Sequence, residues 1–455
     1  MTDTIYQLLS LDLPPFLSAV FAAASCSLLG NFLVLRRVSL MGDAISHAVL
    51  PGIVIAFLVS GSRSSLPIFI GAALAGVLTT LLVELVRRLG RMEAGAAMGV
   101  VFSLLFALGV LLIEQAAARN IDLDADCLLH GQLESIFWYP PETWAQFLSL
   151  STIALLPSEV ITSICVFALC VLFVLALYKE LKIAVFDPAL ATALGFNANA
   201  LHLCTMVLVA GAVVAAFEIV GSILVIAMII CPPATARLLT DKLRTQIILS
   251  LIVSTLAVLC GYVAGAFVPI WLGYQHSISI AGMITVACGT AFGIAVVCAP
   301  QHGVVAKAYR RLSLASQMLA DDVLGLLFRA EELAVENGAS SVKRSQIMEI
   351  LGDQSRTRRA LLRLVNAKLA CETDGTYRLT DAGRVQGLKL VRAHRLWENY
   401  LVERGGLAPE QVHRSAHTLE HFTSPDLGQR LAEQQDFPST DPHGKPIPAA
   451  KVPTT

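Results

Sequence analysis

Histidine and carboxylate side chains gather at helical spacing near the end of this 455-residue sequence. Four of its ten histidines fall between residues 394 and 421. His394 and Glu398 are four residues apart and therefore share one face of a helix. The same kind of face recurs in a second segment with His413, His417, Glu420 and His421. Two antiparallel helices presenting these faces would form one or two metal sites with nitrogen and oxygen ligands. The alternative is that these six side chains form a solvated polar surface. Such a surface gives no reason for histidines and glutamates to occupy matching helix faces.

A second pair of potential ligands lies in an apolar segment near the start of the chain. Residues 39–52 read SLMGDAISHAVLPG, in which Asp43 and His47 are four residues apart on one helix face. A charged side chain inside a membrane span is costly and marks a functional candidate. This carboxylate and imidazole could hold a divalent cation briefly during its passage. The alternative is a hydrogen-bonded pair that only joins neighbouring helices.

The composition predicts a membrane part followed by a soluble part. Of all residues, 55% are hydrophobic and 15% are charged, whereas soluble domains carry about 25% charged residues. Residues 1–298 hold 12 Lys+Arg and 16 Asp+Glu, and residues 299–455 hold 21 and 18. This distribution excludes a secreted protein, a disulfide scaffold and a single globular enzyme. Nine spans are expected, at 16–35, 44–60, 66–86, 94–113, 159–178, 201–217, 220–236, 246–268 and 278–298.

A shorter apolar run at 145–157 could be re-entrant or interfacial. Basic clusters orient the spans, because Lys and Arg concentrate in cytoplasmic loops. They occur at residues 36–37, 87–91, 179–182, 237–244 and 307–311, and alternate with loops poor in Lys and Arg. The N-terminus is therefore expected outside and the soluble part in the cytoplasm, at the cell (inner or plasma) membrane. An odd number of spans agrees with this orientation.

Three segments of the membrane part resemble the zinc/manganese/iron ABC transporter permease family. The longest is RRVSLMGDAISHAVLPG at 36–52. A second signature is VGSILV at 220–225, followed by PPATARLL at 232–239, and FDPA at 186–189 continues to Gly195. The resemblance covers residues 10–298. It implies that two permease subunits, either two copies or two different chains, line a path for the metal.

The resemblance also implies partners and roles for particular residues. A solute-binding protein would deliver the metal outside, and a separate ATPase would drive transport from inside. Independently, no GxxxxGK[ST] motif occurs in the sequence, so this chain has no ATP site of that kind. Asp43 and His47 would face the translocation path. A coupling helix for the ATPase is expected at 187–199, with a plain connecting loop as the alternative; its marker residues are Asp187, Pro188, Ala189 and Gly195.

The soluble part is predicted to begin with a winged helix-turn-helix. An amphipathic helix starts at Ala320, a short helix covers 343–351, and a basic third helix follows Gly352. Asp374-Gly375 is a strong signal for a hairpin turn. The third helix would enter the major groove of DNA, with a solvated basic face as the alternative. Its candidate DNA-binding residues are Gln354, Ser355, Arg356, Thr357, Arg358 and Arg359.

Residues from about Asp321 to Pro448 resemble the diphtheria-toxin-repressor and manganese-regulator family. The matching stretches include LTDAGR at 379–384, HRLWE at 394–398, VH at 412–413, EH at 420–421 and GKPIP at 444–448. The resemblance implies an ancillary-type metal site of His394, Glu398 and His413. It also implies a primary-type site of Asp322, His417, Glu420 and His421. His417 stands where the family has Cys or Glu.

These observations predict an all-α polytopic membrane protein with a C-terminal cytoplasmic winged helix-turn-helix and a helical metal-binding and dimerisation domain. The expected parts are a permease at 1–298, a basic connector at 299–319, the winged helix at 320–385, metal-binding helices at 386–437 and a flexible Pro-rich tail at 438–455.

The expected function is an importer subunit for a divalent transition metal, manganese first with iron or zinc as alternatives, that also senses this metal and is not itself an enzyme. Two other interpretations remain open: a membrane-tethered or proteolytically released metal-dependent repressor, and a C-terminal module that never contacts DNA.

Overall fold

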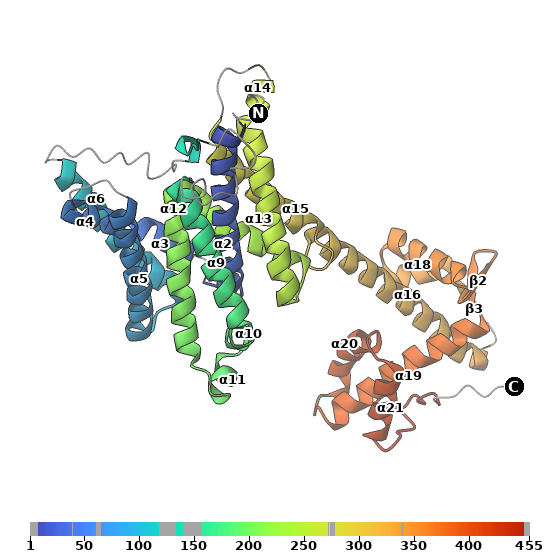
Figure 1. Cartoon of the computed structure of the whole chain (residues 1–455). Coiled ribbons are helices and arrows are strands. Elements are labelled where there is room, and N and C mark those ends of the chain that lie inside the picture. Colours follow the sequence, from blue (N-terminus) through green and yellow to red (C-terminus); the bar gives the residue numbers. More distant parts are fainter. Residues whose placement is uncertain are drawn as a thin grey trace. The chain divides into compact units, whose positions relative to one another are not determined.

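The computed structural model describes residues 8–38, 40–60, 65–117, 133–139, 156–271, 273, 278–337 and 341–449. The chain divides into two compact units, Met1–Ala306 and Lys307–Thr455 (Figure 1). Each unit is described by itself. Most of the run at 145–157, expected to be re-entrant or interfacial, lies outside the described residues.

The first unit is a bundle of apolar helices. Within the described residues, eight helical runs are long and apolar enough to cross a membrane. The helices are η1 (Leu8–Asp12), α2 (Leu13–Leu35), α3 (Met41–Ala48), α4 (Leu50–Ser60), α5 (Ser65–Gly90), α6 (Ala94–Ala117), η2 (Leu133–Ser135), α9 (Ser158–Ala176), α10 (Tyr178–Phe186), α11 (Pro188–Ala193), α12 (Ala198–Leu239), α13 (Leu243–Ala266), α14 (Val268–Trp271) and α15 (Ile280–Cys298).

The expectation of nine separate spans differs from this count at a single element, α12. The sequence divides into apolar runs at 201–217 and 220–236, whereas the structure has one helix of 42 residues. Its regularity is broken inside by Gly221, whose φ of 76° and ψ of 169° are not helical. Glycine is the residue that occupies this region of the Ramachandran map at low cost. The two predicted spans are therefore the segments of α12 before and after Gly221, which we call its two arms.

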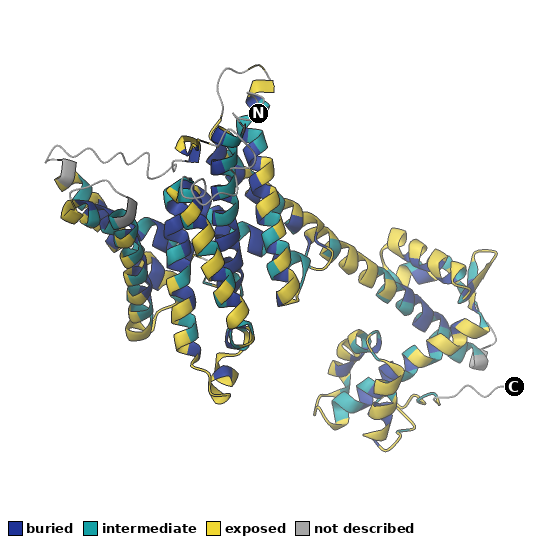
Figure 2. Ribbon diagram, in the orientation of Figure 1, coloured by how far each residue is buried: buried dark blue, intermediate teal, exposed yellow. Residues whose placement is uncertain are grey.

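Helices α2 and α12 form the centre of the bundle. In the most apolar stretch of each of these two helices, 78% of the residues are buried. The corresponding share is 28% in α5 and α6 and 22% in α9. Figure 2 shows the corresponding exposed faces on the outer helices. A Cβ atom at Gly30 would lie 2.1 Å from the carbonyl oxygen of Ile229 and 2.9 Å from Pro233. Such close backbone approach through small residues is typical of membrane helix packing.

The first residues of α12 lie close to the end of α2. Arg36, just after α2, donates a hydrogen bond to the carbonyl oxygen of Ala184 at 3.1 Å. Ala184, Ala191 and Ala198 form a small buried cluster, and Ala198 is the first residue of α12. Both the first residues of α12 and its late segment around Ile229 therefore lie near the C-terminal half of α2.

The second unit combines helices with a small sheet. Its elements are α16 (Val304–Asn337), β1 (Val342–Lys343), α17 (Arg344–Leu351), α18 (Gln354–Asn366), β2 (Ala370–Thr373), β3 (Thr376–Leu379), α19 (Asp381–Glu403), α20 (Pro409–Glu420) and α21 (Pro425–Glu433). The antiparallel sheet has the order β1-β3-β2. Leu324, Leu327, Ile347, Leu361 and Tyr377 belong to the core that joins α16, α17 and α18 to the hairpin.

Two local predictions for this unit have clear outcomes. The Asp-Gly turn is confirmed: Asp374 and Gly375 have positive φ angles of 52° and 72°, as a type I′ hairpin requires. The connector expected at 299–319 is largely helical, because α16 begins at Val304 and continues without a break through residue 319.

Residues 438–449, the first part of the segment expected to be a flexible tail, make specific contacts with the rest of the unit. This segment packs on the rest of the unit, and Thr440 and Pro446 form a β-bridge. Asp441 is buried, and its carboxylate accepts hydrogen bonds from the backbone N–H groups of His443 and Lys445 at 2.9 and 2.8 Å. The buried carboxylate of Asp441 thus holds the turn that contains Pro442, and Pro446 pairs with Thr440 where the turn closes.

Candidate metal centre

Two helices of the second unit carry six of the seven candidate ligands. Helix α19 presents His394 and Glu398, and α20 presents His413, His417 and Glu420, with His421 at its C-cap. Thr380 fixes the start of α19, since its hydroxyl accepts a hydrogen bond from the N–H of Gly383 at 3.1 Å. Helix α20 begins with proline at its first position, where the missing N–H costs nothing. The seventh ligand, Asp322, belongs to α16.

The first group consists of His394, Glu398 and His413. Oxygen Oε1 of Glu398 lies 3.1 Å from His394 Nε2 and 2.9 Å from His413 Nδ1, and these two nitrogens are 3.2 Å apart. Burial raises the pKa of the Glu398 carboxyl, but hydrogen bonds from the two histidines outweigh this effect and lower it to about 2. The carboxylate is therefore ionised at neutral pH and can act as a ligand.

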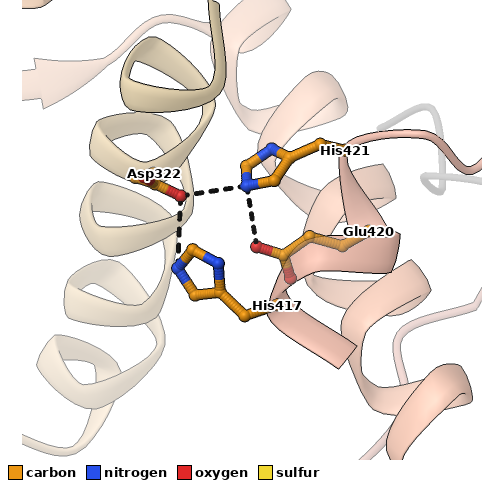
Figure 3. Close-up of side chains that lie close together, drawn as sticks. All are labelled: Asp322, His417, Glu420 and His421. Carbon is orange, nitrogen blue, oxygen red and sulfur yellow. Dashed lines mark ion pairs between the residues drawn. The ribbon is translucent and has the colours of Figure 1, made fainter. Parts of the chain in front are cut away.

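The second group consists of Asp322, His417, Glu420 and His421 (Figure 3). Asp322 Oδ1 lies 3.3 Å from His417 Nε2 and 3.2 Å from His421 Nε2. His421 Nε2 is also 3.8 Å from Glu420 Oε1. Ligand atoms at about 2.1 Å from one ion are themselves roughly 3.0–3.4 Å apart, so most of these separations suit a shared cation.

Two atoms of the second group test this assignment. Asp322 Oδ1 and His421 Nε2 are buried and lie 3.2 Å apart, but neither has a hydrogen bond of good geometry with any described residue. A buried polar atom without a hydrogen bond is costly, and an ion bound between these two atoms would satisfy both at once. The donor set of two imidazoles and two carboxylates suits manganese, iron or zinc. The residues present therefore fit a divalent transition metal.

One direct contact joins the two groups. His394 Nδ1, from the first group, lies 2.5 Å from Glu420 Oε2 of the second. His394 thus faces Glu398 with one ring nitrogen and Glu420 with the other. Such a contact fixes the orientation of both side chains.

The sequence analysis missed two further residues near these groups. Asp321 Oδ2 lies 3.4 Å from His421 Nδ1 and orients that ring. His443 Nε2 lies 4.0 Å from Glu398 Oε1. Asp321 adjoins a predicted ligand and could have been found. His443 gave no such signal, because a turn far along the chain brings it to the first group.

Asp43 and His47 of the first unit lie together on α3. Their closest atoms, Asp43 Oδ1 and His47 Nε2, are 3.4 Å apart, and both side chains are partly exposed. The ring of His47 is 5.4 Å from that of Phe102 and 5.9 Å from that of Phe106, both on α6. The spacing rule for one helix face therefore held for this pair.

The segment predicted to couple to an ATPase forms a short exposed helix. Asp187 is the N-cap of α11, and its carboxylate accepts a hydrogen bond from the N–H of Leu190 at 2.9 Å. Pro188 and Ala189 are exposed in the first turn. Gly195, with a φ of 90°, follows the last turn. The sequence predicted a helix here that starts at Asp187-Pro188, and α11 agrees with this prediction.

Helix α18 presents most, but not all, of the predicted DNA-binding residues. Gln354, Ser355, Arg356, Arg358 and Arg359 are exposed. Thr357 is fully buried and does not share their exposed face. Six consecutive helical residues cannot all face outward, because 3.6 residues complete a turn.

Two family models match the chain in separate regions. That of the ABC 3 transport family matches residues 11–137 and 142–299, more than half of the chain. The chain belongs to this family. A second model, for the iron dependent repressor metal binding and dimerisation domain, matches residues 380–449. The chain is therefore a metal permease of this family fused to such a domain, and the domain match contains α19, α20, α21 and the segment at 438–449.

Relatives and a solved structure agree with this assignment. The manganese transport system membrane protein MntD of Bacillus subtilis is 38% identical over 65% of this chain and 95% of its own length. The zinc transport system membrane protein TroD of Treponema pallidum is 38% identical over 64% of this chain and 74% of its own length. PsaBC from Streptococcus pneumoniae, solved in complex with Fab, has a TM-score of 0.50 and 29% identity over 64% of this chain and 92% of that chain.

Membership of the family has direct consequences. The chain is a multi-pass membrane protein and a non-catalytic subunit of a metal import system. Such a system implies an ATPase and a metal-binding protein as partners.

Proposed function

We propose that this chain is the permease subunit of an importer for manganese, and that its second unit senses the imported metal in the cytoplasm. The observation that carries the proposal is the presence, in one permease chain, of two groups of side chains with metal-ligand spacing. Manganese is chosen first because MntD is described as a manganese transport protein. Iron and zinc remain alternatives, since nitrogen and oxygen ligands suit all three ions.

The path of α12 supports nine crossings of the membrane. A straight helix of 42 residues would be about 63 Å long, roughly twice the hydrocarbon thickness. Yet its first residues and its late segment both lie near the C-terminal half of α2. We infer that α12 reverses at Gly221 and crosses twice. The basic clusters then all fall on one side, so the N-terminus is outside and the second unit is cytoplasmic.

Asp43 and His47 are proposed to line the translocation path. Their partial exposure and mutual contact leave a carboxylate oxygen and an imidazole nitrogen available to a passing ion. We expect Asp43→Asn and His47→Ala to reduce uptake of labelled manganese at least about tenfold in cells that also supply the ATPase and the binding protein. Ser46→Ala, on the same helix, is the matched control and should retain uptake. Normal uptake by both ligand variants would refute this role.

The partners of the permease follow from the same proposal. The exposed helix α11, with Asp187, Pro188 and Ala189 in its first turn, would insert into a surface of the ATPase. Either a second copy or a different permease subunit would complete the path, and an extracytoplasmic binding protein would deliver the ion. Replacing Leu190, which is exposed on α11, by Glu should uncouple ATP hydrolysis from uptake without altering the amount of protein in the membrane.

A second candidate function is DNA binding by the cytoplasmic unit. Helices α16, α17 and α18 with the β2–β3 hairpin have the element order of a winged helix, and Arg356, Arg358 and Arg359 are exposed on α18. The test is selection of duplexes from a randomised DNA library by the full chain with manganese. Arg356→Ala with Arg358→Ala should abolish enrichment, whereas Arg430→Ala on α21 should not. This result together with unimpaired uptake by the Asp43 and His47 variants would favour the tethered or released repressor, and no enrichment at all would favour a module that never contacts DNA.

A further inference from the structure

A pocket of about 490 Å³ lies between three helices of the first unit and contains neither Asp43 nor His47. Its walls come from the last turns of α5, the first residue of α3 and the first turns of α12. Ligand pockets in proteins commonly measure about 300–1,000 Å³, so this pocket has room for a ligand. Because it lies at the ends of membrane helices, a ligand there would sit at the membrane interface.

Positive charge dominates one side of this pocket. Arg88 lines it and donates a hydrogen bond from Nε to Glu84 Oε1 at 2.6 Å. Arg87 donates to the same oxygen at 2.8 Å, so a single carboxylate pairs with two guanidinium groups. Arg36 adds a third positive charge near Arg87 and His202. Three positive charges and one negative charge at the pocket favour an anion over a cation.

Helix α12 adds polar groups to the same pocket. Asn197, its N-cap, and Asn199 in its first turn line the pocket, so the positive end of the helix dipole lies there. The N–H groups at the start of a helix are a common binding site for phosphate. His202 follows within one turn, and its Nδ1 is buried without a hydrogen bond to any described residue. An unsatisfied ring nitrogen near three arginines suits an acceptor such as a phosphate oxygen.

Exposed leucines complete the lining of the pocket. Leu81 and Leu85 of α5 and Leu203 of α12 line it and are exposed at the surface of the unit. In a membrane protein such side chains face acyl chains, which are as apolar as leucine. A free phosphate would leave these leucines uncovered, whereas a phospholipid would contact both the arginines and the leucines. Basic pockets between membrane helices are suited to anionic headgroups.

We propose that this pocket binds an anionic phospholipid, with its phosphate between Arg88 and the first turn of α12 and its acyl chains along the three leucines. By the orientation proposed above, this lipid belongs to the cytoplasmic leaflet. Met41, the first residue of α3, also lines the pocket. A bound lipid would therefore hold the start of the helix that carries Asp43 and His47 against α5 and α12.

The test compares two lipids on the full chain purified in a neutral detergent. Native mass spectrometry would count the molecules of phosphatidylglycerol and phosphatidylcholine that bind from equal amounts of each. We expect phosphatidylglycerol to bind about tenfold more tightly, since its phosphate carries an uncompensated negative charge. Arg88→Gln and His202→Phe should each remove most of this preference. Arg88 is exposed, so its variant keeps the test valid even if His202→Phe fails to fold.

Two further variants give the test its direction. Glu84→Gln should strengthen binding of phosphatidylglycerol several-fold, because it releases Arg87 and Arg88 from their shared carboxylate. Arg244→Gln, at an exposed position on α13 that does not line the pocket, is the matched control and should leave the preference unchanged.

Every outcome bears on the lipid. Equal binding of the two lipids, or an unchanged preference in Arg88→Gln, would overturn the proposal. Weaker binding of phosphatidylglycerol in Glu84→Gln would also overturn it, because a carboxylate that favours the ligand indicates a cation. If glycerol phosphate binds as tightly as phosphatidylglycerol, the acyl chains contribute nothing and the pocket is a site for a free phosphate ester instead.

Discussion

His394 lies between the two groups of ligands, and its ring can couple them. If its Nε2 binds a metal, the proton stays on Nδ1, where Glu420 Oε2 accepts it at 2.5 Å. This fixes the orientation of Glu420, a ligand of the other group. We therefore expect His394→Gln to weaken metal binding at the second group about 10- to 100-fold, although His394 is not a ligand there.

The control for this prediction is His413→Ala. His413 belongs to the same group as His394, but it contacts Glu398 and His394 rather than Glu420. Isothermal titration with manganese, in a chain whose Asp43 and His47 are replaced, would measure the second group. Equal effects of the two variants would show that simple loss of the first site, and not the contact with Glu420, governs the second.

Proton release should accompany metal binding at His421. Burial lowers the pKa of this imidazole, but its close contacts with the carboxylates of Asp321 and Asp322 and the nearby charge of Glu420 outweigh burial and raise it from 6.5 to about 9. In the metal-free protein His421 therefore stabilises the fold below pH 6.5, and this contribution is lost as the pH rises through about 9. A metal must displace this proton, so its apparent affinity should rise about tenfold per pH unit between pH 6.5 and 9. Affinities that are constant over this window would contradict the prediction.

The seven candidate ligands could be predicted from the sequence, whereas their neighbour His443 could not. Side chains three or four residues apart lie on one helix face in any fold. This rule was enough to group His394 with Glu398, and to group the histidines and glutamate of α20. The turn at Asp441 brings His443 close to the first group, and no local sequence pattern predicts this contact. Thr357, predicted together with the exposed residues of α18, is buried because it lies on the same helix face as Leu361 and Leu364.

Gly221 controls the largest helix of the first unit. Its φ of 76° and ψ of 169° lie in a region that is essentially restricted to glycine, so Gly221→Ala should cost about 1–3 kcal/mol in stability. It should also lower uptake, because α12 forms the centre of the bundle together with α2. Gly211→Ala in the same helix is the control, since a Cβ there would meet nothing within 4 Å. Thermal unfolding in detergent would compare the two variants, and equal melting temperatures would refute a strained break.

At the scale of elements, predictions succeeded where local chemistry is decisive. The Asp-Gly hairpin and the Asp-Pro start of α11 are examples, because both need only a few neighbouring residues. The arms of α12 were identified as two apolar runs, although the helix is counted as one. The contacts of residues 438–449 could not be predicted, because two arginines of α19 hold this segment from more than 50 positions away in the sequence.

The whole molecule joins a transport unit to a unit with candidate metal sites, and its division was predicted from the distribution of charge. Residues 1–298 could be assigned to the membrane because apolar spans must be long and almost uncharged. The structure divides the chain at residues 306 and 307, close to that boundary. The effect of the second unit on transport can be tested by removing this unit from the chain.

We expect that a chain ending at Gly303, before α16, still imports manganese but no longer responds to manganese inside the cell. Without the ligands of the second unit, internal metal has no site on the chain from which to slow transport. Uptake of labelled manganese would be measured in cells preloaded with different amounts of the metal, in the presence of the ATPase and the binding protein. The intact chain should slow several-fold as the internal metal rises, whereas the shortened chain should not.

The intact chain with His417→Ala and His421→Ala is the control for loss of the unit as a whole. It keeps every element but loses two ligands of the second group, so it should behave like the shortened chain if metal binding is the signal. If it slows as the original does, the metal sites do not regulate transport. If transcription of metal-responsive genes changes instead, the second unit acts through DNA, because the same ligands would then control a different output.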